Sequence, residues 1–207
     1  MKNVFFKPWI GSNYYSGGVF NKKILIIGEA HICGGCPTCG IKYSPFCEDI
    51  STQDIIKSYL EYHQGYWART FRKFERALVG EYTDNSQSEA IWNSLAFYNY
   101  IQVSMDAARK KPSLNLFKEA EEPFWEVIKS LSPDLIICWG KTRLYENMPS
   151  SNWEKGDPII YENMEAYTGT YSINKGQIKI QTIWIVHPSS SFSWIKWNQI
   201  LKNYIYE

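Results

Sequence analysis

The sequence predicts an α/β protein with a three-layer α/β/α fold and a central, mainly parallel sheet of four strands. Two observations support this class. Four short apolar runs have the length and composition of buried strands, namely Ile24–Gly28, a run around Phe97–Val103, Leu135–Gly140 and Ile178–His187. Segments with helical spacing separate these runs, and strands that alternate with helices favour a parallel sheet covered on both faces.

The helices are located from their spacing and their end signals. Ser51 or Thr52 can cap a helix that begins at Gln53 and continues with apolar residues at helical intervals. Further helices are expected over Tyr66–Val79, over Glu122–Leu131 with Pro123 in its first turn, shortly after Gly140, and over Trp194–Tyr204. The segment Asn147–Lys175 is rich in Gly, Asn, Ser and Pro, which indicates a long loop or a β-excursion before the last strand.

The composition is that of one globular domain spanning residues 1–207, large enough to bury a core of its own. Lys and Arg number 22 against 21 Asp and Glu, which excludes a broadly basic, nonspecific nucleic-acid binder but leaves room for a local basic groove. The 9 Trp, 15 Tyr and 10 Phe indicate either a large aromatic core or a surface that stacks planar ligands. No apolar window approaches about 18 residues and no sustained apolar run follows Met1, so we expect a cytoplasmic protein without a membrane span or signal peptide.

Four of the five cysteines lie close together, at Cys33, Cys36, Cys39 and Cys47. The Pro and Gly around Cys36 and Cys39 set a tight turn that can direct two thiolates at one ion, so a four-cysteine metal-binding loop is expected over residues 33–47. Structural zinc is the first choice, and a [4Fe–4S] cluster is the alternative. Four thiolates leave no open position for water, so the metal is expected to be structural. Cys138, inside a predicted strand, is expected to be a core residue.

Two predicted strands end in polar side chains that suit chemistry. The first strand runs into Glu29 and His31, and the last runs into His187-Pro188-Ser189 followed by further serines. The carboxyl ends of parallel strands are where open α/β sheets bind their ligands. An imidazole beside hydroxyls and backbone N–H groups suits an anionic leaving group or a phosphate. Simple capping roles for Glu29 and His187 stay open at this point.

These two strand ends resemble the two signature motifs of the uracil-DNA glycosylase superfamily. Gly28-Glu29-Ala30-His31 is similar to the Gly-Glu-Ala-Pro-Gly first motif of the iron–sulfur branch, and His187-Pro188-Ser189 is similar to the second motif. Between them, Phe97–Gln102 resembles the family strand whose Asn reads the uracil edge, which points to Asn99. Ser132–Gly140 resembles the family pattern of a helix followed by Pro, a hydrophobic strand and Gly. The resemblance runs in order from residue 22 to residue 200.

The chain departs from the family at three points. Ala30 stands where the best-known branch has the Asp that orients the attacking water, and His31 replaces the usual Pro. The cysteines lie in one loop, whereas the iron–sulfur branch spreads its cluster ligands over distant segments. This difference favours zinc.

The resemblance implies a DNA N-glycosylase, a hydrolase of DNA repair that removes uracil or a related damaged base. The protein is expected to act as a monomer, and its expected partner is DNA that contains uracil or is single-stranded. Its catalytic residues would be Glu29, which positions or deprotonates water, and His187, which stabilises charge on the departing base. Asn99 would hold the Watson–Crick edge of the base, with His31 in the pocket wall and Phe46 stacking on the base. The expected DNA contacts are Ser189, Ser191, Phe192, Lys141 and Arg143.

Two other functions stay open. The chain could be a catalytically inactive protein of the same fold that binds a nucleotide or single-stranded nucleic acid, or a zinc-stabilised interaction module. The near-neutral charge and Ala30 favour these alternatives, whereas the ordered set of Glu29, Asn99 and His187 favours the enzyme.

Overall fold

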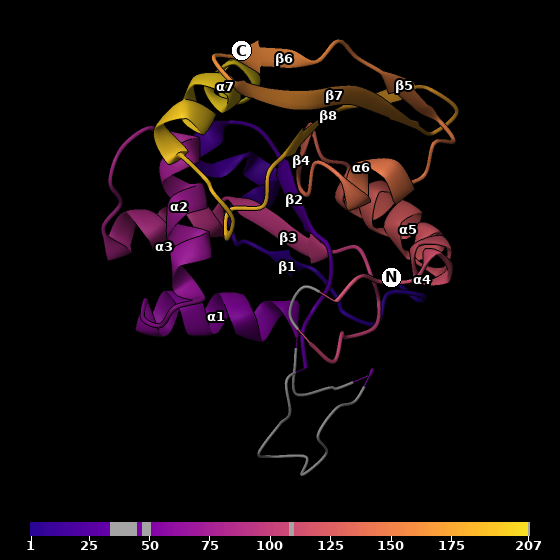
Figure 1. Ribbon diagram of the computed structural model, residues 1–207, viewed down its shortest axis with the longest axis horizontal. Helices are drawn as coiled ribbons and strands as arrows, with labels where there is room; N and C mark the ends of the chain where they lie inside the picture. Colours follow the sequence, from indigo (N-terminus) through magenta and orange to yellow (C-terminus); the bar gives the residue numbers. More distant parts are fainter. Residues whose placement is uncertain (34–44, 47–50, 108–109, 207) are drawn as a thin grey trace.

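A computed structural model describes residues 1–33, 45–46, 51–107 and 110–206 (Figure 1). Within these residues the chain forms a mixed eight-stranded sheet in the order β1-β3-β2-β4-β8-β7-β5, with β6 paired to β7. The strands are β1 (Trp9–Ile10), β2 (Ile24–Gly28), β3 (Leu95–Asn99), β4 (Leu135–Trp139), β5 (Trp153–Lys155), β6 (Ile159–Tyr161), β7 (Met164–Ile173) and β8 (Ile178–Ile185).

The centre of the sheet is a parallel core of four strands, β3-β2-β4-β8, as predicted. In its register Gly28 pairs with Asn99 and Ile27 pairs with Cys138, so these strands end at one common edge. The sheet is wider than predicted, because β1 pairs antiparallel with β3 and the β7–β8 hairpin adds antiparallel strands at the other side. The expected β-excursion before the last strand is confirmed as β5, β6 and β7.

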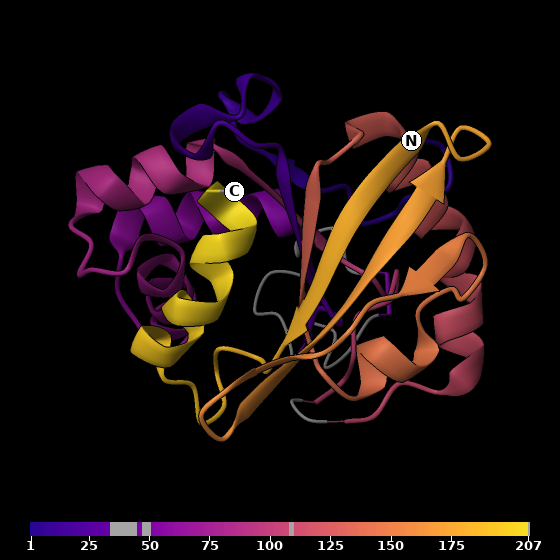
Figure 2. The same ribbon diagram turned by 90° about the horizontal axis from the view of Figure 1, so that it is seen from above.

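Helices cover both faces of the sheet (Figure 2). One face carries α1 (Thr52–Tyr62), α2 (Ala68–Val79), α3 (Asn85–Asn93) and α7 (Trp194–Tyr206), and the other carries α4 (Leu114–Glu119), α5 (Glu121–Leu131) and α6 (Arg143–Asn147). Side chains of β2 alternate between the two cores, with Ile24 and Ile26 in the first and Leu25 and Ile27 in the second. The period of two residues along each strand therefore supplies both layers with apolar surface.

The predicted cap of the first helix agrees with the observed one, whereas α2 begins two residues after its predicted start. The Ser51 hydroxyl accepts a hydrogen bond of 3.0 Å from the Asp54 N–H at the start of α1. Helices α3 and α4 were not predicted, although the start of α3 is fixed by a capping box between Asp84 and Gln87. No helix in the described ranges is long and apolar enough to cross a membrane.

A buried carboxylate joins three helices of the first layer. Glu75 of α2 accepts hydrogen bonds from the Tyr59 hydroxyl (2.6 Å) and the Trp92 indole N–H (2.7 Å) at Oε1. Its Oε2 accepts from the hydroxyls of Thr83 (2.9 Å) and Ser88 (2.8 Å). Four donors on one carboxylate satisfy the polar group that this core buries, and they fix α1, α2 and α3 relative to one another.

Candidate functional site

The polar residues singled out from the sequence gather at the carboxyl edge of the parallel core. Glu29 follows β2, Asn99 ends β3, Arg143 lies just after β4 and His187 lies just after β8. The chain leaves β2 toward the face that α1 covers and leaves β4 toward the face that α6 covers. In open α/β sheets, ligands usually bind at the edge between neighbouring strands whose connections diverge in this way.

Asn99 and His31 form one half of the site. The Asn99 Nδ2 lies 3.3 Å from His31 Nδ1 and 3.1 Å from Nε2, and His31 Nε2 also lies 2.9 Å from the Thr52 hydroxyl. Burial lowers the pKa of His31 to about 4, so the ring is neutral at pH 7 and can accept from the amide. Gly28 allows this arrangement, because a Cβ at that position would lie 2.3 Å from Asn99 Oδ1.

Glu29 and Arg143 form a two-point ion pair across the edge. Arg143 Nε donates to Glu29 Oε2 over 2.7 Å, and Nη2 donates to Oε1 over 2.6 Å. The fork geometry of guanidinium and carboxylate makes this a strong, oriented pair. It joins the end of β2 to the first turn of α6, which is a contact between residues 114 positions apart. Arg143 was expected as a DNA contact, but it forms its ion pair with Glu29, the residue expected to position or deprotonate water.

His187 has a defined tautomer. The Ser189 backbone N–H donates to His187 Nδ1 over 3.1 Å, and the Ser189 hydroxyl lies 2.8 Å from the same nitrogen. Because a backbone N–H can only donate, Nδ1 carries a lone pair and the proton of the neutral ring sits on Nε2. Burial and, to a smaller degree, the charge of Arg143 lower the pKa of His187 to about 4. At pH 7 the residue is therefore a neutral Nε2–H donor, with its ring edge against Trp139.

Aromatic residues flank the His31 side of the site. Phe46 is exposed, and its ring contacts Phe5 at 5.2 Å between centroids. Phe5 in turn contacts Phe6, and the ring of Phe6 lies 4.5 Å from the imidazole of His31. The predicted stacking residue Phe46 thus connects to His31 through two phenylalanines of the N-terminal segment, which the sequence analysis did not single out. The Phe5-Phe6 pair next to the chain start is the signal that could have found them.

The remaining candidate DNA contacts divide into exposed and buried groups. Ser189 and Ser191 are exposed. Lys141 forms an ion pair of 2.7 Å with Glu165 and lies over the ring of Tyr167. Phe192 belongs to the core, where it stacks on Trp197 with 15° between the ring planes. Phe192, expected as a DNA contact, is therefore buried in this conformation, because its ring anchors the loop to α7.

Of the four predicted metal ligands, only Cys33 lies in the described residues, and it is buried. Its backbone N–H donates to the Met105 carbonyl over 2.8 Å, which ties the start of the cysteine segment to the chain after β3. Cys36, Cys39 and Cys47 lie outside the described residues. Among the residues that are described, no group of three or more His, Cys, Asp or Glu side chains could hold a metal ion. The zinc site stays a prediction. Cys138 is a core residue of β4, as expected.

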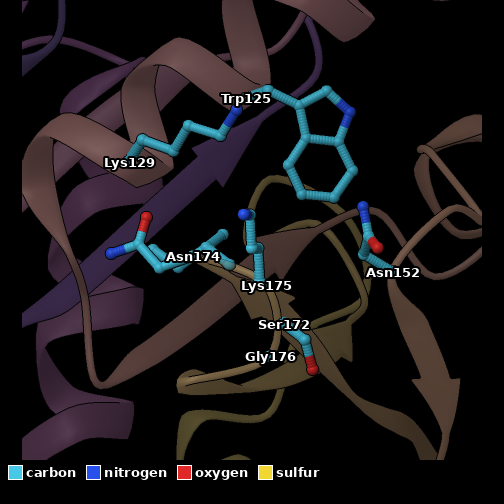
Figure 3. A pocket seen from close by; sticks show the side chains of 8 residues that line it. Trp125, Lys129, Asn152, Ser172, Asn174, Lys175 and Gly176 are labelled. Carbon is cyan, nitrogen blue, oxygen red and sulfur yellow. The ribbon is translucent and has the colours of Figure 1, made fainter.

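A cavity of about 750 Å³ lies at the opposite, amino edge of the parallel core (Figure 3). It is bounded by the C-terminal half of α5 and by the turn between β7 and β8. Its lining includes Trp125, Lys129, Asn152, Asn174 and Lys175. None of the residues predicted to act on a substrate lines it.

Comparison of the chain with models of known protein families finds no match, and comparison with curated proteins finds none either.

Proposed function

We propose that the protein is a divergent uracil-DNA glycosylase-like hydrolase that cleaves the N-glycosidic bond of uracil or a related damaged base in DNA. The observation that carries this proposal is the set of polar groups at one sheet edge, in particular a neutral His187 with its N–H on Nε2 and an Arg143 guanidinium whose charge acts on the pKa of His187. A donor and a cation at one place suit a reaction in which the leaving group becomes an anion.

Asn99 supplies the recognition of the base. Its amide nitrogen has two hydrogens, of which one is used by His31, and its Oδ1 accepts no hydrogen bond from the residues that the structure describes. The carboxamide therefore keeps one donor and one acceptor, which match a carbonyl oxygen and the ring N–H on the edge of uracil. Phe46 provides an exposed ring near this side of the site for stacking on the base.

His187 and Arg143 act on the leaving group. As the glycosidic bond breaks, its electron pair moves onto the base, and the negative charge spreads to the base carbonyl oxygens. The His187 Nε2–H can donate to such an oxygen without a change in protonation, and the guanidinium adds positive charge nearby. The target base must first leave the duplex or arrive in a single strand, because its glycosidic bond is out of reach inside the stack.

Glu29 acts on the nucleophile. Each of its oxygens accepts one hydrogen bond from Arg143, and a carboxylate has further acceptor positions that can hold a water molecule. That water attacks the sugar carbon, and its proton leaves with the help of the carboxylate. Ala30 has no group for this task, so Glu29 is the nearest candidate. The four-cysteine loop would shape the chain beside Glu29 and His31, held by structural zinc.

One observation favours a second function. Arg143 binds both oxygens of Glu29, and a carboxylate so engaged can be a structural tie rather than a catalyst. With Ala30 in the neighbouring position, this favours a protein of the same fold that binds a nucleotide or single-stranded nucleic acid without cleaving it.

The test is incubation of the protein with single- and double-stranded oligonucleotides that contain one uracil, followed by alkali to cut abasic sites. His187→Ala should lower the rate of uracil release about 10²- to 10³-fold, because it removes one donor to the departing base. Lys129→Ala, at the opposite edge of the sheet, is the matched control and should leave the rate unchanged. Absence of cleavage at high protein concentration, with oligonucleotide binding that Asn99→Ala does not alter, contradicts the proposed function.

A further inference from the structure

The connection between α1 and α2 exposes an unusual amount of aromatic surface. Tyr66 is 84% exposed, Tyr62 is 60% exposed and Trp67 is 43% exposed. Gly65 lies between them with φ of +95°, and a Cβ there would lie 3.0 Å from the Trp67 indole nitrogen. The loop therefore has a backbone conformation that suits glycine and holds the indole close to the chain. Exposed aromatic side chains that gather at one connection indicate a binding surface.

Helix α2 is basic. It carries Arg69, Arg72, Lys73 and Arg76, of which Arg69 is exposed and the other three are half-buried, and its one carboxylate, Glu75, is buried in the core. No ion pair within the described residues involves any of these four cations. The chain as a whole has a net charge of only +1, so this helix concentrates positive charge that is balanced elsewhere.

Cations and aromatic rings are interleaved on this surface. The Arg69 guanidinium lies 5.3 Å from the centre of the Tyr66 ring, and the Arg76 guanidinium lies 4.3 Å from that of Tyr82, which is also exposed. A guanidinium on a ring keeps N–H groups available for phosphate while the ring offers its other face. We define the aromatic-basic surface as Tyr62, Tyr66, Trp67, Arg69, Lys73 and Tyr82.

This surface connects to the candidate site through aromatic contacts. The ring of Trp67 lies 5.8 Å from that of Phe71, at the start of α2. The ring centroid of Phe71 lies 5.9 Å from that of Trp139 at the end of β4, and the ring centroid of Trp139 lies 5.6 Å from that of His187. The aromatic-basic surface therefore lies on the His187 side of the site, with the buried rings of Phe71 and Trp139 between Trp67 and His187.

We propose that the aromatic-basic surface binds single-stranded nucleic acid, with unpaired bases stacked on Tyr66 and Trp67 and phosphates on the basic face of α2. Alternating rings and cations are the combination that holds a single strand without reading its sequence. This inference deepens the proposed function, because it specifies single-stranded nucleic acid as the form of the substrate that approaches the site. It rests on the proposed function only in the step that brings a base to His187.

The direct test measures binding of a fluorescein-labelled, uracil-free single-stranded DNA of about 15 nucleotides by fluorescence anisotropy. Tyr66→Ala should weaken binding about 5- to 150-fold, the range for loss of one stacked base. Its side chain is almost wholly exposed, so the fold should be unaffected, which a thermal melt can verify. Trp67→Ala should act in the same direction, and a fully paired duplex of the same sequence should bind more weakly.

The salt dependence separates charge from stacking. Arg69→Ala combined with Lys73→Ala should reduce the slope of log affinity against log salt by about 1.4, because each single-strand phosphate contact contributes about 0.7. The matched control is Lys129→Ala combined with Lys175→Ala, which removes the same charge at the opposite edge of the sheet and should keep the wild-type slope.

Each outcome bears on one proposal. Unchanged DNA binding by Tyr66→Ala and by the Arg69 and Lys73 double variant overturns the inference, even if uracil is released. Binding that depends on these residues, without uracil release, supports the inference and contradicts the glycosylase. If Tyr66→Ala changes only the sedimentation of the protein alone, the surface is a contact between copies of the chain and the inference is wrong.

Discussion

Replacement of Gly28 by alanine should displace the base-reading carboxamide of Asn99. The new Cβ would lie 2.3 Å from Asn99 Oδ1, more than 1 Å inside an ordinary contact of about 3.4 Å. The two residues are paired neighbours in β2 and β3, so neither backbone can move away without breaking the ladder between the strands. The Asn99 side chain must therefore rotate and lose its hydrogen bond to His31.

The cost follows from that clash. Overpacking of a buried position costs about 1–3 kcal/mol, and we expect Gly28→Ala to lower the free energy of unfolding by this amount. In an Asn99→Ala background the nearest remaining atom is Phe97 Cζ at 3.3 Å, which is only slightly tight. There the substitution should cost less than about 1 kcal/mol, because alanine also restricts the unfolded chain. Urea denaturation of the four proteins of this cycle gives the coupling energy, expected at about 1–2 kcal/mol.

The same cycle reports on function. If Asn99 holds the base, a displacement of about 1 Å should reduce uracil release about 10²-fold in Gly28→Ala, with no further loss when Asn99→Ala is added. An equal stability cost of Gly28→Ala in both backgrounds would show that the clash is relieved elsewhere, and would refute the reasoning.

Three further predictions concern the core, the pH dependence and the metal. Glu75→Leu should lower the free energy of unfolding in urea by more than about 3 kcal/mol, because it leaves the Trp92 indole and neighbouring hydroxyls unpaired, whereas Glu75→Gln keeps an acceptor for the indole and should cost much less. His31 has a folded-state pKa of about 4 against an ordinary 6.5, so the unfolded chain binds its proton first. Stability should thus fall by up to about 3 kcal/mol as pH drops from about 6.5 to 4, and a shallower fall is expected for His31→Gln. Elemental analysis should find about one zinc ion per chain. The Cys36→Ser variant should lack this zinc and should have a lower melting temperature than the wild-type protein. A brown protein that contains iron would contradict zinc.

The parallel core could be predicted because its strands are nearly uninterrupted apolar runs. Strands buried on both faces have this signature, and β2 was predicted with its observed bounds. In contrast, α3 is mostly polar and buries only Ser88, Ile91 and Trp92, so its apolar pattern is weak and only the capping box marks it. The two-residue β1 is too short for any periodicity and owes its existence to pairing with β3.

The location of the candidate site could be predicted from the sequence, but the contacts between its side chains could not. Glu29 and His187 each follow an apolar strand, and topology alone brings such ends to one edge. The ion pair between Glu29 and Arg143, and the contact between Gly28 and Asn99, depend on strand order and register, which are set by packing of the whole domain. A local sequence window contains neither, so Arg143 was predicted as a DNA contact and its pairing with Glu29 was not predicted.

The charges at this edge also bear on whether Ala30 excludes the proposed reaction. A general base contributes about 10²- to 10⁴-fold to a rate. Each well-placed donor to a developing anion contributes about 10²- to 10³-fold. Under the proposed function the His187 N–H is one such donor, whereas the Arg143 guanidinium is already paired with Glu29. Stabilisation of the departing base can thus match the lower part of the contribution that a water-orienting Asp would add. On these magnitudes Ala30 predicts a slower glycosylase rather than an inactive one, provided that Glu29 holds the water while it remains paired with Arg143.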